Sequence, residues 1–434
     1  MNEDLQMKFK EKVLQFGEGN ILRAFIEEYI NEANDNGYDG KVVVCQPRTN
    51  NRVINLLNAQ NCSYDIVKRG KLNGELIDKR VKINCISRCI DSSTNMSDIE
   101  STFCSDELEL VISNTTESGI VYDENDELSS FPCVSFPAKI TYLLYNRYKD
   151  GKNGVVFFPT ELIENNGEVL KNCILKYVKL WNLGKDFSDY VNNDCSFCTT
   201  LVDRIVTGHN ENDDDKCSVT CEPYRLLVVS CDERAKKILP FKDDTVIYTD
   251  NLSLYRERKV KILNGIHTLI APGAYISGID IVRDAVNNEH FSKMIKNALP
   301  EIISTIDFND EECYAFANEV LERFSNPFID HKLFDISLNS VSKFKSRILP
   351  SIIKYAKING TAPVTLSRSL AYLIAFYNHK SDRKYQPNDS NSVLSFFENM
   401  RTVKAVMVNI NFWDIDLNKI PNMTEIVEEF YNEI

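Results

Sequence analysis

Three side chains suited to proton transfer lie close together in the stretch "YRERKVKILNGIHTLIAPGAYISG". At about 100° per residue, Lys259, Asn264 and His267 fall on one side of a helix. A lysine amine can donate a proton to a hydroxyl or carbonyl oxygen, or remove one from it. An asparagine amide can hold that oxygen as charge develops on it, and a histidine can fix a neighbouring hydroxyl or tune the lysine. The set predicts acid–base chemistry at a carbon–oxygen group.

The same three residues have a structural interpretation as well. Lysine, asparagine and histidine on one helix are often surface residues, and His267 is flanked by Ile266, Leu269 and Ile270. These apolar neighbours predict that His267 is at least half buried, so a satisfied histidine in the core is the alternative to a catalytic one.

A second stretch, "QFGEGNILRAF", opens like a dinucleotide-binding loop. It follows an apolar run and begins a G-x-G-x-x-G pattern, with Leu22 where the third glycine is expected. Gly17 would allow the tight turn and Gly19 the close approach of a pyrophosphate to the start of the following helix. Leu22 implies a wider helix crossing, and Arg23 is either an anion ligand or a solvated helix residue. The candidate cofactor residues of this loop are Phe16, Gly17, Gly19, Asn20 and Arg23.

Further cofactor contacts are expected where other strands end, because ligands bind at the carboxyl ends of parallel strands. "SNTTESGI" follows one strand and supplies Asn114 and Thr115, although the same residues could simply form a turn. In "VDRIV", Asp203 and Arg204 are charges inside an apolar strand, so they form an ion pair or belong to a site. The second strand ends in Gln46-Pro47-Arg48 without the acid that usually takes the ribose 2′-hydroxyl, and Arg48 could accept the 2′-phosphate of NADP.

The elements that must position these residues alternate in the first half of the chain. Such alternation predicts an α/β fold, a Rossmann-like domain with a mainly parallel sheet over residues 1–248. From about residue 250 the pattern is helical, with breaks expected at Pro300, Pro327, Pro350 and Pro363, so residues 249–434 are expected to form a mostly α-helical domain. The expected strands are 41–45, 108–113, 154–158, 200–206 and 226–230, and the expected helices are 21–34, 137–149 and 167–183.

Composition limits the class of protein. A net charge of −13 disfavours nucleic acid or an anionic membrane as the main partner, and leaves a small anionic substrate possible. No transmembrane run or signal peptide is evident, and 13 scattered cysteines favour a reducing cytoplasm over a disulfide framework. Cys195, Cys198, Cys217 and Cys221 have a spacing like that of a zinc ribbon, but a buried strand explains the first pair, so no metal is expected. The sequence carries no signal for an oligomeric state.

The motifs together resemble the mannitol dehydrogenase family, the polyol-specific long-chain dehydrogenases. The resemblance runs nearly end to end and rests on Lys-x4-Asn-x2-His, on "GEGNILRAF", where the missing third glycine is a family trait, and on "CTTLVDRIV" and "RFSNPFIDHKLFDISLNSVSKFKSRILP". "SNTTESGI", "FPAKIT", "TELIENNG" and "KVKILNGIHT" are similar to the branch that acts on sugar acids. The resemblance implies NAD(H), no metal, a Rossmann-like first domain and a helical second domain.

The sequence departs from the mannitol-type pattern at positions that are expected to contact the substrate. Leu162 replaces an asparagine that contacts the oxyanion, so Asn264 is the only such amide or Glu161 has moved into the site. Lys343 matches the family's substrate lysine, but Asp335 occupies the position of an arginine eight residues earlier. Lys343 and Arg347 lie one helical turn apart and could hold a carboxylate, and Asn339 is a further substrate candidate from "LNSVSK". The alternative for Arg347 is a surface residue paired with an acid.

The expected function is therefore NAD-dependent hydride transfer to the keto group of a sugar acid, with NADP open. The first alternative is the same chemistry on another uronate or on mannitol and fructose. The second is a non-catalytic NAD-binding sensor or scaffold, which the intact lysine, asparagine and histidine set argues against.

Overall fold

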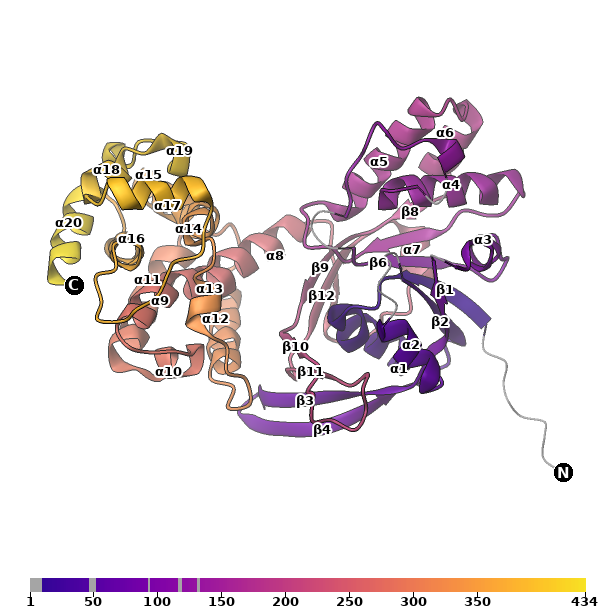
Figure 1. Ribbon diagram of the computed structural model, residues 1–434, viewed down its shortest axis with the longest axis horizontal. Coiled ribbons are helices and arrows are strands. Elements are labelled where there is room, and N and C mark those ends of the chain that lie inside the picture. Colours follow the sequence, from indigo (N-terminus) through magenta and orange to yellow (C-terminus); the bar gives the residue numbers. More distant parts are fainter. Residues whose placement is uncertain (1–9, 47–51, 93, 116–118, 131–132) are drawn as a thin grey trace. The chain divides into compact units, whose positions relative to one another are not determined.

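The computed structural model describes residues 10–46, 52–92, 94–115, 119–130 and 133–434. Two compact units make up the chain (Figure 1). The first comprises residues 1–69 and 77–252, and the second comprises residues 70–76 and 253–434. The candidate cofactor residues and Glu161 belong to the first unit, whereas the candidate catalytic residues and the other substrate residues belong to the second.

A six-stranded parallel sheet forms the centre of the first unit, as the alternation of strands and helices predicts. The chain runs outward from the middle strand in one direction and then in the other. Cofactors bind where the order reverses, which here is the edge between β1 and β6. Across the sheet the strands are β5 (Ile86–Asp91), β2 (Gly40–Gln46), β1 (Lys10–Phe16), β6 (Leu110–Ser113), β7 (Val156–Pro159) and β8 (Ser196–Phe197).

Successive side chains of each strand point to opposite faces of this sheet. Helices cover both faces, so the side chains on both sides are buried. Val13 and Leu14 of β1, for example, belong to different hydrophobic clusters. The helices α1 and α2 pack on one face, and α3 to α6 pack on the other (Figure 1). The helical segments of this unit are η1 (Leu22–Ile26), α1 (Glu27–Asp35), α2 (Arg52–Ala59), α3 (Met96–Phe103), η2 (Leu128–Ser130), α4 (Phe136–Lys149), α5 (Asn166–Leu180), α6 (Lys185–Asn193) and α7 (Glu233–Ile238).

Two smaller sheets were not expected from the sequence. The strand predicted at 200–206 ends instead at Asp203, and residues 206–208 join a different sheet. The break lies at Arg204, whose buried side chain turns to an acid of the first helix, as described below. One small sheet contains β10 (Val206–Gly208), β11 (Val219–Cys221), β3 (Tyr64–Leu72) and β4 (Glu75–Ile83), and the other contains β13 (Val246–Tyr248), β12 (Leu226–Ser230) and β9 (Thr199–Asp203).

The second unit is helical around one large hydrophobic core, as expected. Pro300 does not break a helix: α11 continues through it to Ile303, because the apolar side chains of that turn are buried in the core. The segments are α8 (Leu252–Lys259), η3 (Val260–Asn264), α9 (Gly265–Ile276), α10 (Val282–Asn287), α11 (Glu289–Ile303), α12 (Asp310–Phe324), α13 (Leu333–Ile336), α14 (Ser340–Arg347), α15 (Leu349–Asn359), α16 (Val364–Tyr377), α17 (Asn391–Asn399), α18 (Val403–Met407), α19 (Ile410–Trp413), η4 (Leu417–Lys419) and α20 (Met423–Glu433).

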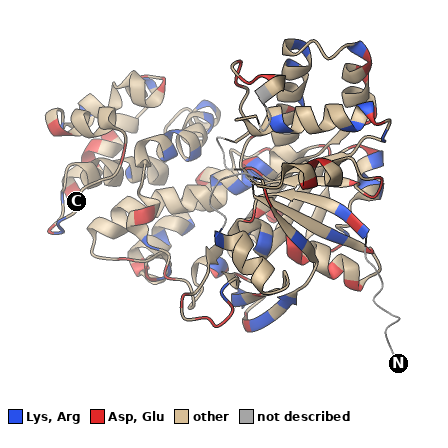
Figure 2. Cartoon of the chain, turned by 45° about the vertical axis from the view of Figure 1, so that its right-hand side comes forward, with Lys and Arg blue, Asp and Glu red and all other residues tan. Residues whose placement is uncertain are grey.

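Acidic and basic residues are interspersed along the elements of both units in the view of Figure 2. Within the described ranges, none of the helices has both the length and the apolar composition needed to cross a bilayer.

Candidate active site

The glycine loop after β1 has the geometry of a phosphate cradle. Gly17 has φ +117°, and a Cβ there would lie 3.1 Å from Leu22 Cδ1 and 3.2 Å from the carbonyl oxygen of Asn114, so only glycine fits. A Cβ on Gly19 would meet nothing within 4 Å, which leaves the start of the helix open to an approaching group. Free N–H groups at that helix start favour an anion. These features fit the pyrophosphate of a dinucleotide.

The helix that follows the loop begins with a π-turn at Leu22–Ile26. Leu22, at the position of the usual third glycine, is fully buried and packs against Gly17. The leucine therefore has a place in the core, while the wider helix crossing stays a prediction. Phe16 is likewise a core residue, with its ring 5.3 Å from that of Phe136.

Arg23 is neither solvated nor directed into an open site. It is 5% exposed. Its Nε donates to the carbonyl oxygen of Glu18 at 2.9 Å, its Nη1 to that of Cys217 at 2.5 Å and its Nη2 to Asn20 Oδ1 at 2.8 Å. These contacts favour a role in holding the glycine loop, and a direct contact of Arg23 with cofactor stays a prediction.

A buried carboxylate organises the neighbouring strand ends. Glu161, just after β7, accepts hydrogen bonds from the Thr115 N–H at 2.9 Å, from Thr115 Oγ1 at 2.9 Å and from Ser113 Oγ at 3.1 Å. Burial raises the pKa of Glu161, and these hydrogen bonds oppose that effect. Asn114 donates to the carbonyl oxygen of Thr160 at 3.0 Å. Glu161 thus shapes the turn that carries Asn114 and Thr115, and residues 116–118 of "SNTTESGI" lie outside the described residues.

The two charges in "VDRIV" have different surroundings. Arg204 forms a buried ion pair with Glu28 of α1, and its Nη1 also donates to the carbonyl oxygen of Ala24 at 2.7 Å. Of the two readings from sequence, the ion pair therefore holds for Arg204. Asp203 is buried at the end of β9, and its contact with cofactor stays a prediction.

In the second unit, a π-turn brings the lysine and asparagine onto one face. Lys259 ends α8, the π-helical turn η3 follows, and His267 lies in the first turns of α9. In a regular α-helix, residues five apart point about 140° away from each other. A π-turn, with its i→i+5 bonds, has more residues per turn and so brings Lys259 and Asn264 closer to the same face than a regular α-helix would. The helix therefore aligns the three residues more closely than α-helical spacing alone would do.

His267 is held as a neutral ring. It is 7% exposed, as its apolar neighbours predict, and stacks on Phe324 at 4.0 Å between ring centroids. His331 lies edge-on at 5.0 Å. Within the residues that the structure describes, His267 Nε2 has no hydrogen-bond partner. Burial lowers the pKa of His267 well below its usual value, and neighbouring His331 and the positive charges of Arg347, Arg323 and Lys343 lower it further.

The substrate candidates of the second unit belong to this basic cluster. Lys343 is half-buried, and its Nζ donates to the carbonyl oxygen of Ile336 at 2.8 Å. Burial and, after it, the charge of Arg347 lower the pKa of Lys343. Arg347 Nη1 donates to Thr268 Oγ1 at 3.4 Å. Thr268 Oγ1 in turn donates to the carbonyl oxygen of Asn264 at 2.9 Å, so Arg347 is linked to the helix that carries the catalytic candidates. Asn339 is exposed at the start of α14 with φ +54°, so it turns the chain into the helix that carries both cations.

The cysteines that suggested a zinc ribbon do not converge on a metal. Cys195 belongs to the core on one face of the sheet, whereas Cys198, Cys217 and Cys221 belong to the core on the other. Across the described part of the chain, no three histidine, cysteine or acidic side chains come close enough to bind one ion.

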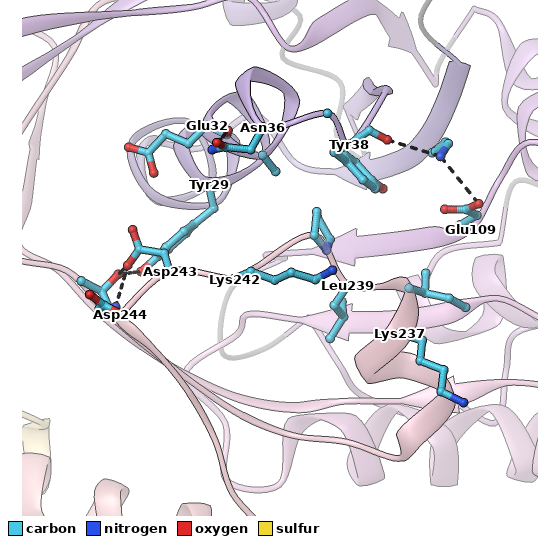
Figure 3. A pocket seen from close by; sticks show the side chains of 16 residues that line it. Tyr29, Glu32, Asn36, Tyr38, Glu109, Lys237, Leu239, Lys242, Asp243 and Asp244 are labelled. Atoms are coloured by element: carbon cyan, nitrogen blue, oxygen red, sulfur yellow. Dashed lines mark hydrogen bonds and ion pairs between the residues drawn. The ribbon is translucent and has the colours of Figure 1, made fainter.

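A large cavity of the first unit lies away from the cofactor edge. It has a volume of about 870 Å³ and is shown in Figure 3. Lys12 and Glu109 line it near the amino ends of β1 and β6, and Tyr38 lines it just before β2. It therefore opens at the edge of the sheet opposite to the glycine loop.

Two residues that the structure places beside the candidate residues were not singled out from the sequence. His331 lies within the "FIDHKLF" segment, and only the rarity of histidine, five in the chain, marked it. Glu18 lies between the two glycines and contacts Gln46 at the end of β2; the absence of an acid after β2 was the only sequence feature that could have drawn attention to it.

Both halves of the chain match models of known domains. Residues 11–241 match the mannitol dehydrogenase Rossmann domain, and residues 251–434 match the mannitol dehydrogenase C-terminal domain. The chain is 37% identical to altronate oxidoreductase of Bacillus subtilis strain 168 over 458 residues, spanning 99% of this chain and 94% of that protein. It is 36% identical to altronate oxidoreductase of Phocaeicola vulgatus over 446 residues, spanning 96% and 93%.

Solved structures show the same fold. The Pseudomonas fluorescens mannitol 2-dehydrogenase ternary complex with NAD and D-mannitol matches with a TM-score of 0.74 at 17% identity, covering 98% of this chain and 92% of that one. A substrate-free D-sorbitol dehydrogenase matches with a TM-score of 0.85 at 15% identity, covering 98% and 93%. With both domain models matched and relatives above 30% identity over nearly the whole chain, this protein belongs to the mannitol dehydrogenase family.

Proposed function

We propose that this protein is an NAD-dependent tagaturonate reductase, which interconverts D-tagaturonate and D-altronate in hexuronate catabolism. The observation that carries the proposal is the similarity to altronate oxidoreductases over nearly the full length of both chains. All 13 cysteines are free thiols, which supports a place in the reducing cytoplasm.

When bound, NADH supplies the hydride that reduces the keto carbon. Lys259 donates a proton to the oxygen that gains charge, so one hydride and one proton turn the carbonyl into an alcohol. The amide of Asn264 donates a hydrogen bond to the same oxygen. His267, neutral because it is buried among cations, offers Nε2 to a hydroxyl without adding a positive charge. In the reverse direction Lys259 removes the proton.

The carboxylate of the substrate is assigned to Lys343 and Arg347. Both lie on α14, and both contribute to the positive field around His267. A uronate carries a carboxylate and mannitol does not, so a basic cluster next to the catalytic helix fits a sugar acid. Asn339 and Glu161 remain substrate candidates, Asn339 through its position before α14 and Glu161 through the turn that it binds.

NADH is the proposed cofactor, and NADPH is a second candidate. A cavity of about 370 Å³ beside the start of α2 is lined by Arg52, His209 and Lys216, and the positive charges of Arg52 and Lys216 favour a 2′-phosphate. Arg48, the residue that raised this possibility in the sequence, lies outside the described residues.

A panel of substrates followed by NADH absorbance tests the proposal. Tagaturonate, fructuronate and fructose are offered with NADH and with NADPH, and altronate and mannitol with the oxidised cofactors. We expect the highest kcat/KM with tagaturonate and NADH. A preference for fructuronate or fructose would indicate the substrate of another branch of the family. An absence of turnover with every substrate would support a non-catalytic sensor or scaffold.

A further inference from the structure

The edge of the sheet that selects between NAD and NADP lacks its usual acid. In dinucleotide-binding sheets, an acid after the second strand accepts the 2′-hydroxyl of the adenine ribose. Here β2 ends at Gln46, and Pro47 and Arg48 follow. The strand itself therefore supplies an amide at the position from which a carboxylate normally reaches the ribose.

The glycine loop brings a carboxylate to this position. Gln46 Nε2 donates to Glu18 Oε1 at 2.5 Å, and Gln46 is only 4% exposed, so its amide is fixed. The carbonyl oxygen of Gln46 accepts from Ser92 Oγ at 2.5 Å. The N–H of Gly17 donates to the carbonyl oxygen of Cys45 at 2.9 Å. The loop is thus tied to the end of β2 at two points, and half-buried Glu18 carries its charge to that strand end.

Two carboxylates, Glu18 and Asp91, and one cation, Lys139, act on this edge. Burial raises the pKa of the Cys45 thiol, and the charges of Glu18 and Asp91 raise it further against the opposing effect of Lys139. Asp91 ends β5 and is paired in register with Gln46. Two carboxylates therefore lie at the end of β2, and Glu18, which is hydrogen-bonded there, would favour a hydroxyl donor over a phosphate dianion.

We propose that Glu18 is the residue that accepts the ribose 2′-hydroxyl and selects NAD(H) against NADP(H). This inference rests on the proposed use of NADH. It assigns to the residue between the two glycines a role that sheets of this kind give to an acid on the second strand. The cavity lined by Arg52, His209 and Lys216 acts in the opposite sense, because its basic side chains favour a 2′-phosphate. Removing the Glu18 charge should therefore weaken the binding of NADH and strengthen the binding of NADPH.

Binding of the two reduced cofactors to single variants tests the inference without any turnover. NADH and NADPH are titrated into the protein, and each Kd is measured from cofactor fluorescence. Glu18→Gln removes the charge at constant size, and we expect about a tenfold rise in Kd for NADH together with a fall in Kd for NADPH. The ratio of the two values is the decisive quantity, because the cofactors differ only in the 2′-phosphate and a general loosening of the loop weakens both.

Two further variants complete the design. Glu18→Gln combined with Gln46→Glu exchanges the amide and the carboxylate, keeps their hydrogen bond and places the acid on the strand, so preference for NADH should return. Glu164→Gln, at an exposed acid on another loop, is the matched control and should leave both Kd values unchanged.

The possible failures are distinguishable. A wild-type protein that binds NADPH more tightly than NADH would overturn the proposed cofactor itself. A wild-type preference for NADH with an unchanged Kd ratio in Glu18→Gln would overturn the role of Glu18 alone, as would an exchanged pair that folds and still fails to discriminate.

Discussion

Replacing Lys343 by methionine tests whether the basic cluster of the second unit reads the substrate carboxylate. Methionine keeps an unbranched apolar chain and removes the ammonium group. Lys343 is half-buried and lies near a second cation, Arg347. Two neighbouring positive charges repel each other, so a bound carboxylate would stabilise both.

The expected magnitude follows from the kind of contact that is lost. A hydrogen bond to a charged group contributes about 1.5–3 kcal/mol, and about 1.4 kcal/mol is a factor of ten. Partial exposure and the remaining charge of Arg347 favour the lower end, so KM for tagaturonate should rise about tenfold. A neutral ketose such as fructose should be affected much less.

The control for this variant lies on the same helix. Lys345 pairs with Asp414 at 2.7 Å and is assigned no substrate contact, so Lys345→Met should leave both KM values unchanged. Steady-state kinetics with both substrates make the comparison. If Lys343→Met impairs both substrates in proportion, the lysine contacts the hydroxyl chain that they share. If it impairs neither, the carboxylate site lies elsewhere and the assignment is refuted.

Three further predictions concern stability. Burial holds the pKa of His267 well below 6.5, so the unfolded chain takes up the proton first and stability decreases as the pH falls below about 7. Urea unfolding of His267→Gln should show a flatter pH dependence, and an equal slope would contradict the burial argument. Glu161→Leu leaves the two donors of Thr115 without their acceptor and should cost about 1–3 kcal/mol of unfolding free energy, whereas exposed Glu164→Leu should cost almost nothing. Arg204→Met leaves Glu28 short of one buried partner and should cost about 3 kcal/mol by the same assay, the lower end of the range because Lys68 and Arg225 remain beside Glu28; a loss below about 1 kcal/mol would refute that account.

The local patterns of the sequence were enough to predict the central parallel sheet and the helical second unit, but not the two smaller sheets. Strands that are buried on both faces read as continuous β-branched runs, and the helices between them require parallel pairing. The position of the glycine loop between β1 and a helix followed in the same way. Gly17 confirms the need for a tight turn, since its φ of +117° excludes other residues.

The contacts within the sites depended on distant parts of the chain. Arg23 donates to the carbonyl oxygen of Cys217, 194 residues away, and Arg204 pairs with Glu28, 176 residues away. Nothing in the spacing around either arginine specifies such partners. The π-turn before Gly265 was also hidden, because a shift from i→i+4 to i→i+5 bonding leaves no composition signal.

Turnover of Lys259→Ala with tagaturonate and NADH, measured beside the NADH Kd, tests the central claim most directly. In the proposed reaction the lysine acts on the reacting oxygen and not on the cofactor, so kcat should fall about 10²–10⁴-fold while the Kd for NADH stays unchanged. A loss of less than tenfold in kcat would remove Lys259 from its role and contradict the proposed reaction at this site.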